Sequence, residues 1–387
     1  MKKIIRYMQN QALEYSDDKY NSAAYLAPKD MKEPQQRQRH GYRSHHITHH
    51  VSRASNPSAH AHSIPHHVSG ASGPFPIPHA VQRVQYGSDN ILQSYEVYVP
   101  EPTPDPIEKA AKANAMDTGE GSGWSTPRPK YWVVYIHGGY FRDPKVTASS
   151  FQQTLGQLIN PTTSNQAIRE VQSHIAGYAS INYRLAPHEG HPQDDSVPEY
   201  ERRNAQWPEM MNDVLAALKH LQQKHNFGER YLLVGHSVGA TMALLAALKA
   251  RDAGLEAPMA VAGVCGIYDF EALHKRWPGY DTLTRNAIKD ESEWPKASPG
   301  RYTRSEYEKA WARGSQRWVL LAQSKNDGLV DFEQAEEMNK VFEEGKDGFI
   351  MSEVMEIKGK HNEVWEKGGE LARVVAAGVG EMMSIDQ

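Results

Sequence analysis

Residues 231–250, YLLVGHSVGATMALLAALKA, join a short apolar run to a helical pattern through Gly235-His236-Ser237-Val238-Gly239. The run predicts a buried strand, and the segment after it predicts a helix over 238–251. The five residues between them fit G-x-S-x-G, whose glycines let the chain turn sharply from strand to helix. The pattern also occurs by chance, but the flanking strand and helix favour a functional interpretation. We expect Ser237 to be a nucleophile, with the Val238 amide stabilising an oxyanion.

Other apolar runs alternate with helical patterns in the same way. Strands are predicted at 131–136, 175–183, 231–235, 260–267, 317–323 and 351–357, and the alternation of Leu92–Pro100 predicts a half-buried strand. Helices are predicted at Pro208–His225, Val238–Arg251 and Asp331–Glu344, the first with a stripe of Met211, Val214, Leu215 and Leu218. Such alternation is typical of an α/β fold, with a mostly parallel sheet and helices on both faces.

A second signal, His137-Gly138-Gly139-Tyr140, directly follows the predicted strand 131–136. Small residues there let backbone amides turn toward the serine, as in loops that complete an oxyanion hole. The amides of Gly139 and Tyr140 are the candidates, with Gly138 beside them. An ordinary turn with two glycines would explain this motif by itself, but not its pairing with the turn at Ser237.

An acid and a base should follow Ser237 in the order Ser, Asp or Glu, His. The loop after strand 317–323 offers Asp327 and Asp331, of which Asp331 has a structural explanation as a helix cap with Gln334 three residues on. We therefore expect Asp327 to be the orienting carboxylate. His274 precedes it, which leaves His361, after the last predicted strand, as the base.

Composition excludes several classes of protein. The 387 residues carry a net charge of −4, without the positive field of a nucleic-acid-binding protein. The one cysteine, Cys265, allows no internal disulfide and suits a reducing compartment. No run reaches the ~20 apolar residues of a membrane span, and residues 1–20 lack the apolar stretch of a signal peptide. We expect a soluble, cytoplasmic protein that binds neither membranes nor nucleic acids.

The N-terminal part differs in composition from the rest. Residues 37–79 contain ten of the 19 histidines and show no apolar period. Such a segment predicts a disordered extension; a His-rich metal site, a translated intron and a misassigned start are the alternatives. We expect residues 1–80 to form this extension and 81–387 the catalytic domain, with order evident from about Tyr86. A polar surface insert is expected at about 101–130.

The chain from Tyr86 onward resembles the fungal kynurenine formamidases (arylformamidases) of the α/β-hydrolase superfamily. The resemblance covers about three quarters of the chain. It rests on YGSDNILQSYEVYVP, IHGGYFRDP, NYRLAPHEGHPQ, LLVGHSVGAT, GIYDFEAL, SKNDGLVD and KHNEVW. The family's HGGxW motif corresponds to His137–Phe141, with Phe141 in place of tryptophan. Its nucleophile, acid and histidine correspond to Ser237, Asp327 and His361.

The resemblance implies an α/β-hydrolase fold and hydrolysis of N-formyl-L-kynurenine to L-kynurenine and formate, in tryptophan degradation toward NAD. It also implies a homodimer. Tyr140, Phe141, Tyr268 and Trp207 are candidates to stack on the substrate ring, or else pack in the core. Arg142 is a candidate for the amino-acid head, or else holds its own loop. No cofactor and no metal are expected, because Asp194 and Asp195, near His188 and His191, lie in a Pro-rich loop.

Two rival functions remain. A carboxylesterase of the hormone-sensitive-lipase type shares the HGG loop, the turn at Ser237 and the order of the triad. A binding protein on the same scaffold would have lost catalysis, which the complete set of Ser237, Asp327 and His361 argues against.

Overall fold

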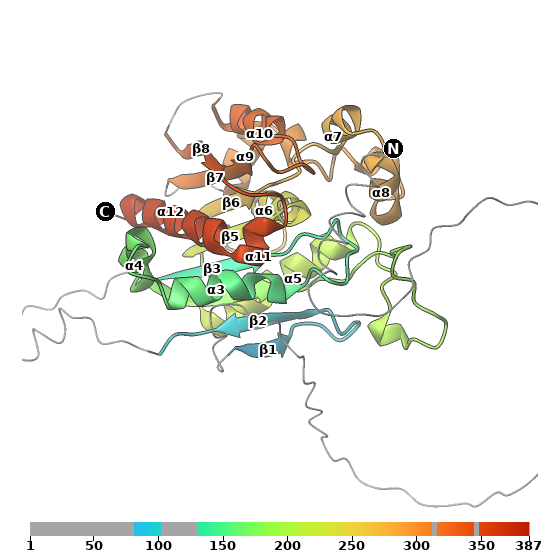
Figure 1. Ribbon diagram of the computed structural model, residues 1–387, viewed down its shortest axis with the longest axis horizontal. Helices are drawn as coiled ribbons and strands as arrows, with labels where there is room; N and C mark the ends of the chain where they lie inside the picture. Colours follow the sequence, from blue (N-terminus) through green and yellow to red (C-terminus); the bar gives the residue numbers. More distant parts are fainter. Residues whose placement is uncertain (1–80, 102–129, 312–315, 344–347, 387) are drawn as a thin grey trace, which may run out of the picture. The chain divides into compact units, whose positions relative to one another are not determined.

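The computed structural model describes residues 81–101, 130–311, 316–343 and 348–386. Within them, an eight-stranded sheet has the order β1-β2-β4-β3-β5-β6-β7-β8 (Figure 1). The strands are β1 (Gln82–Gln85), β2 (Ser94–Tyr98), β3 (Tyr131–Ile136), β4 (Ile175–Ile181), β5 (Tyr231–His236), β6 (Ala260–Val264), β7 (Arg317–Ser324) and β8 (Ile350–Ile357). The extension expected at 1–80 and the core of the expected insert, 102–129, lie outside the described residues.

The direction of the strands matches the predicted fold class. β2 is antiparallel to β1 and β4, and every other neighbouring pair is parallel. All the predicted strands are present, with ends that shift by a few residues. β1 lies just before Tyr86, near which order was expected to begin, and it was not among the predicted strands. Three of the four β1 side chains are exposed, so the edge strand has no apolar alternation to reveal it.

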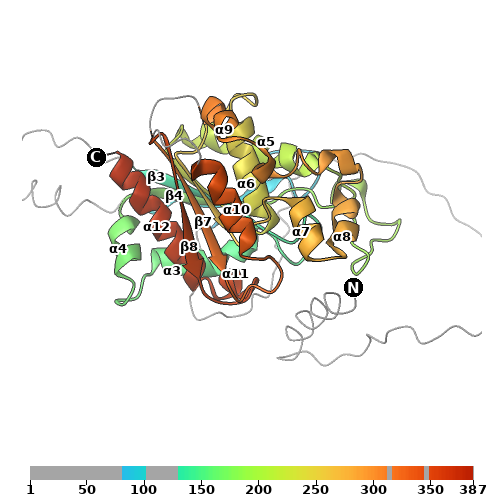
Figure 2. The same cartoon turned by 90° about the horizontal axis from the view of Figure 1, so that it is seen from above.

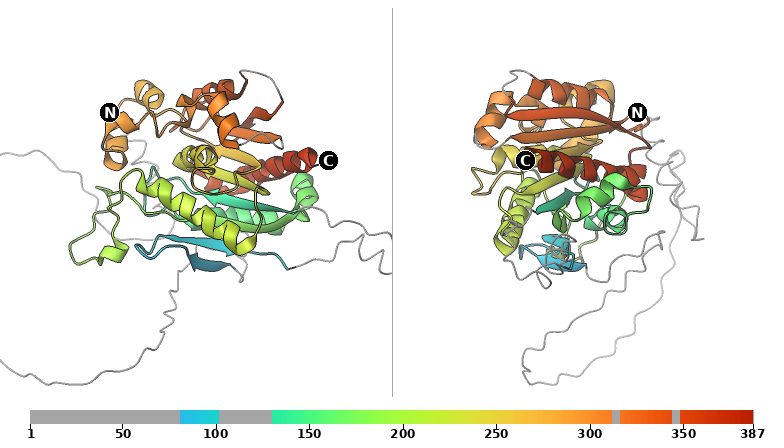
Figure 3. Two further views of the ribbon diagram at one scale, coloured as in Figure 1. Left: turned by 180° about the vertical axis from the view of Figure 1, so that it is seen from behind. Right: turned by 90° about the vertical axis from the view of Figure 1, so that its left-hand side faces the viewer.

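Helices cover both faces of the sheet. They are η1 (Ala148–Phe151), α3 (Gln152–Ile159), α4 (Gln166–Gln172), η2 (Glu199–Glu201), α5 (Glu209–His225), α6 (Val238–Lys249), α7 (Phe270–Arg276), α8 (Tyr280–Ala287), η3 (Glu291–Glu293), η4 (Pro299–Arg301), α9 (Arg304–Trp311), α10 (Glu333–Glu343), α11 (Glu363–Lys367) and α12 (Gly369–Ile385). Seen from above, α3, α4 and α12 lie on one side of the strands and α5, α6 and α9 on the other (Figure 2). From behind, α5 crosses in front of the sheet (Figure 3).

The central strands are buried on both faces, as parallel strands between two helical layers must be. Every residue of β3 is buried, and alternate side chains along it point to opposite faces. Tyr131, Val133 and Tyr135 join Leu155 of α3 and Val375 of α12 in one hydrophobic cluster. This core anchors the strands whose carboxyl ends carry the candidate site.

The carboxyl edge of the sheet collects the loops that follow β3, β5, β6, β7 and β8, the usual place for a site in such a fold. These loops begin with His137, Ser237, Cys265, Lys325 and Lys358. α7 and α8 lie at this end of the domain (Figure 1). None of the helices in the described ranges is both long enough and apolar enough to span a bilayer.

Candidate active site

Ser237 lies on the turn between β5 and α6. Its backbone adopts φ 56 and ψ −124, a combination that a non-glycine residue holds only when its surroundings enforce it. Its amide donates to the Val264 carbonyl over 2.9 Å, and a Cβ on Gly239 would collide with the Ile136 carbonyl. Val238 opens α6, so its amide has no partner within the helix. The result is a sharp strand-to-helix turn of the expected kind, with Ser237 4% exposed.

The loop after β3 turns beside this serine. Gly139, Tyr140 and Phe141 have positive φ values of 87, 49 and 65, three left-handed residues in a row. A Cβ on Gly138 would lie 3.0 Å from the Cβ of Ser237, so the loop backbone touches the nucleophile position. Within the described ranges, the amides of Gly139 and Tyr140 have no protein acceptor. Both amides are available for an oxyanion.

Asp327 is buried in the loop after β7, and its carboxylate is fully engaged. Oδ1 accepts the amides of Leu329 and Val330 over 2.9 and 2.8 Å, and Oδ2 accepts Gln323 Nε2 over 3.2 Å. Burial by itself would raise the pKa of this carboxyl. The His361 ring and the two amides outweigh burial, and the net pKa is lowered. Asp327 is therefore ionised at neutral pH.

His361 is tied to Asp327 by both its backbone and its ring. Its amide donates to the Asp327 carbonyl over 3.1 Å, and its Nδ1 lies 2.9 Å from each carboxylate oxygen. Because an ionised carboxylate can only accept, Nδ1 carries the proton and Nε2 keeps a lone pair. The His361 carbonyl accepts His236 Nε2 over 3.0 Å, which ties this loop to the neighbour of Ser237. The structure thus gathers the three predicted residues, Ser237, Asp327 and His361, at one edge.

Two further buried histidines border the site, and the sequence analysis assigned no role to either. Burial, followed by the charge of His361, lowers the pKa of His236 to about 3. Burial lowers the pKa of His137 to about 4. His137 stacks on Tyr183 with ring centroids 4.2 Å apart. Both rings are therefore neutral at neutral pH and add no positive charge that would oppose protonation of His361.

Cys265 lies on the inner side of the same cluster. One ligand atom each of His236, Cys265 and His361 lies within 4.8 Å of the others, the residue types that bind zinc. Burial and the nearby Asp327 carboxylate raise the pKa of the Cys265 thiol well above its ordinary value. We assign this cluster to the triad and no metal to it, because His361 Nδ1 is already bonded to the Asp327 carboxylate.

Three of the four aromatic candidates for ring stacking, Tyr140, Phe141 and Trp207, pack against one another. The Phe141 ring is fully buried and meets the Trp207 ring edge-on at 6.0 Å. Tyr268 is also buried, with its hydroxyl against the backbone of Gly263. The Tyr140 hydroxyl bonds to Thr284 Oγ1 over 2.9 Å. Contact between these rings and a substrate stays a prediction.

Two charged residues have partners that the sequence did not suggest. Arg142 Nη1 binds Glu189 over 2.8 Å, so the guanidinium anchors one loop to another. Asp331 was expected to cap a helix together with Gln334. Instead, its carboxylate binds Arg276 Nε over 2.9 Å, and Gln334 Oε1 accepts the Tyr268 amide over 2.7 Å. That capping prediction was wrong, because both side chains have other partners: Asp331 binds the last residue of α7, and Gln334 binds the loop that leads into α7.

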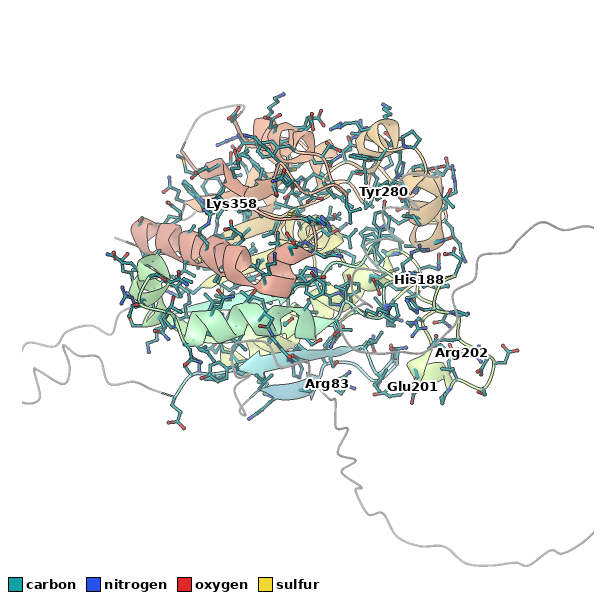
Figure 4. The ribbon with its side chains drawn as sticks, viewed as in Figure 1. Arg83, His188, Glu201, Arg202, Tyr280 and Lys358 are labelled. Carbon is teal, nitrogen blue, oxygen red and sulfur yellow. The ribbon has the colours of Figure 1, made fainter. Side chains whose placement is uncertain are left out.

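A cavity of about 480 Å³, here called the polar cavity, lies between the 187–206 loop and the end of α8. It is lined by Glu189, Arg202, Arg203, Gln206, Arg285 and Lys289, among others. His188 and Arg202 are labelled on this side of the molecule, below Tyr280 (Figure 4). The sequence analysis missed this cavity. Its lining residues come from segments about 80 positions apart, and no local pattern joins them.

Comparisons with known proteins agree with this geometry. The model of the "Alpha/beta hydrolase family" matches residues 113–336. A kynurenine formamidase-like hydrolase of Fusarium equiseti is 31% identical over 265 residues, covering 66% of this chain and 85% of the relative. A kynurenine formamidase of Aspergillus versicolor is 29% identical over 262 residues, covering 62% and 85%.

Among solved structures, a hyperthermophilic esterase from Pyrobaculum calidifontis has a TM-score of 0.51 and 16% identity, covering 80% of this chain and 88% of its own. At that identity the likeness concerns the fold alone. The family match covers more than half of the chain, and the relatives are about 30% identical, so together they identify the family as well as the fold. The chain belongs to the alpha/beta hydrolase family, and kynurenine formamidases are among its relatives.

Proposed function

We propose that the protein hydrolyses N-formyl-L-kynurenine to L-kynurenine and formate with Ser237 as nucleophile. The observation that carries the chemistry is the buried Asp327–His361 pair, 2.9 Å apart at both oxygens, beside the strained turn of Ser237. The choice of substrate is supported by the relatives, of which one is named as a kynurenine formamidase and another as a kynurenine formamidase-like hydrolase.

The reaction begins when Ser237 Oγ attacks the formyl carbon. His361 Nε2 takes the hydroxyl proton, because Nδ1 is already committed to Asp327. The amides of Gly139, Tyr140 and Val238 hold the oxyanion, with Gly138 keeping the loop close to the serine. His361 then donates its proton to the arylamine nitrogen, the C–N bond breaks, and L-kynurenine leaves. Water, deprotonated by His361, hydrolyses the formyl ester of Ser237 to formate.

Asp327 acts in this scheme by fixing the tautomer of His361 and stabilising the imidazolium. His236 and His137 stay neutral and leave the positive charge on His361. A homodimer, a cytoplasmic location and a place in tryptophan degradation toward NAD stay predictions from the resemblance.

The test is formate release from N-formyl-L-kynurenine by the full chain, with Ser237→Ala beside it. We expect turnover in the wild type and a loss of about 10⁶-fold in the variant. Cleavage of nitrophenyl acetate without formate release would reject the formamidase and favour the carboxylesterase. If a fluorophosphonate also fails to label Ser237, the binding-protein alternative gains instead.

A further inference from the structure

His236, the residue before Ser237, is buried where three loops of the site meet. It ends β5, and only 1% of its surface is exposed. Its ring centroid lies 4.6 Å from that of His361, and a Cβ on Gly138 would lie 2.9 Å from its Nδ1. The proposed reaction uses this imidazole neither as an acid nor as a base, although it touches the segments of all the reacting groups.

A hydrogen bond to the base loop (358–362) fixes the tautomer of His236. Nε2 lies 3.0 Å from the His361 carbonyl oxygen, and because a carbonyl oxygen can only accept, Nε2 carries the proton. Nδ1 therefore keeps its lone pair, and it is buried with no hydrogen-bond partner in the described residues. One ring nitrogen thus binds the base loop, and the other lies against Gly138 of the oxyanion loop (137–141).

Asp327 places His361 relative to β7, not relative to the nucleophile. It accepts the His361 amide at its carbonyl and Nδ1 at its carboxylate, and both groups belong to the loop after β7. Ser237 follows β5, and β6 separates β5 from β7 in the sheet. Within the described ranges, the bond from His236 is the only hydrogen bond that joins the turn 236–239 to the base loop.

The chemistry depends on the distance that this bond spans. A base takes a proton only when the two heavy atoms approach to about 2.6–3.2 Å, and a displacement of about 1 Å can lower the rate about 10²-fold. Because His236 precedes Ser237 directly, its ring moves with the nucleophile. A hydrogen bond from that ring to the His361 carbonyl therefore keeps the base and the nucleophile together.

We propose that His236 is a positioning residue that holds His361 Nε2 within proton-transfer distance of Ser237 Oγ. It acts through the His361 carbonyl and transfers no proton itself. The inference deepens the proposed function and rests on it for the roles of Ser237 and His361. Since every acyl donor that Ser237 attacks needs the same proton transfer, loss of His236 should affect formamide and ester substrates alike.

The test compares His236→Leu, which has no donor, with His236→Gln, whose amide nitrogen extends about as far from the backbone as the imidazole Nε2. His236→Leu should lower kcat on N-formyl-L-kynurenine and on nitrophenyl acetate about 10²-fold, with KM within about threefold of the wild type. His236→Gln should restore kcat to within about tenfold of the wild type. An unchanged kcat in His236→Leu, or no recovery in His236→Gln, would overturn the proposal.

Tyr307→Phe is the control for the loss of a buried hydrogen bond. The Tyr307 hydroxyl donates to the Pro299 carbonyl over 3.0 Å and so links α9 to η4. Its kcat should stay within about threefold of the wild type; a loss equal to that in His236→Leu would overturn the proposal. Thermal melting shows whether each variant is folded. If His236→Leu is not, His236→Asn replaces it, because asparagine keeps an amide but is too short to reach the His361 carbonyl.

A double-mutant cycle gives the readout that a merely structural role would not move. In a His361→Gln background the base is absent, while the backbone carbonyl that accepts from His236 remains. Adding His236→Leu there should lower the residual hydrolysis of nitrophenyl acetate by less than about twofold, because residues that act as a unit have non-additive effects. A further fall as large as that in the wild-type background would overturn the proposal.

The choice of reagents separates this inference from the proposed function. If the wild type cleaves nitrophenyl acetate but releases no formate, the formamidase assignment fails, and the ester kinetics still decide the role of His236. If the wild type cleaves neither substrate, the rate at which a fluorophosphonate labels Ser237 replaces kcat, with the same order of variants expected. Absence of labelling in the wild type would reject both the inference and the proposed function.

Discussion

The triad cluster (Ser237, Asp327 and His361) and the polar cavity differ in how their polar groups are satisfied. The Asp327 carboxylate accepts hydrogen bonds from two amides, one side chain and His361. Among the residues that line the polar cavity, Arg203 Nε and Gln206 Oε1 are buried without partners in the described residues.

The difference separates two tasks. A reacting group gains from a rigid, fully bonded surrounding, because its geometry must already suit the transition state. A recognition surface needs the reverse, because groups already paired within the protein offer little to a ligand. Substitutions in the triad cluster should therefore change kcat.

The largest effect should come from Asp327→Asn. An asparagine can donate to His361 Nδ1 and so favours the wrong tautomer, which should lower kcat about 10⁴-fold for every substrate. Steady-state kinetics on N-formyl-L-kynurenine and nitrophenyl acetate measure this loss.

Asp331→Asn is the matched control, four residues further along the same segment. Its carboxylate binds Arg276 and has no contact with His361, so kcat should stay within about threefold. A loss in Asp331→Asn as large as that in Asp327→Asn would contradict the assignment of the acid.

A smaller effect is expected from Gly138→Ala, in the loop beside the triad cluster. The new Cβ would lie 2.9 Å from His236 Nδ1 and 3.0 Å from the Ser237 Cβ, so the loop must move away from the serine. Loss of one oxyanion donor lowers kcat about 10²- to 10³-fold, and we expect a fall of this size with KM little changed.

Gly380→Ala in α12 is its control, because a Cβ there meets nothing within 4 Å. It should leave kcat unchanged and stabilise the helix by about 0.5–1 kcal/mol. An unaltered kcat in Gly138→Ala would show that the loop does not press on Ser237.

The smallest effect concerns the pH dependence of the free energy of unfolding. His236 and His137 have folded-state pKa values of about 3 and 4, below the unfolded value of about 6.5. Between the folded and unfolded pKa values, the unfolded chain binds more protons than the folded chain. The stability that the neutral histidines contribute is therefore fully present above about pH 6.5 and is lost as the pH falls. Each histidine should contribute about 1.4 kcal/mol per pH unit to the free energy of unfolding.

Urea unfolding between pH 6 and 4.5 measures this slope. His236→Gln should reduce the slope by the share of one histidine, because it removes a buried imidazole whose folded-state pKa is about 3. An unchanged slope in His236→Gln would contradict a neutral, buried imidazole at this position.

Much of the architecture was predictable, because it depends on short windows of sequence. The strand before Ser237, the glycines around it and the helix after it are encoded within 20 residues, and the left-handed turn follows from that pattern. Asp327 and His361 were identified by their order along the chain, and the structure does bring both to the same edge. Their roles in catalysis stay predictions that the kinetic variants test.

Other features depend on contacts between distant segments. β1 has too few buried side chains to produce an apolar pattern, and it forms a strand because β2 offers it a free edge. Asp331 pairs with Arg276 instead of capping a helix, since folding brings the guanidinium at the end of α7 to 2.9 Å from its carboxylate.

The sequence by itself thus determined the parallel sheet, the turn at Ser237 and the residues available for acyl transfer, because periodicity and glycine placement act locally. Only the tertiary structure decided that Arg142 is held by Glu189 while Arg203 is left with a free donor. Whether a charge is paired or available depends on which loops pack beside it, and that packing is set by the whole fold, not by neighbours in the chain.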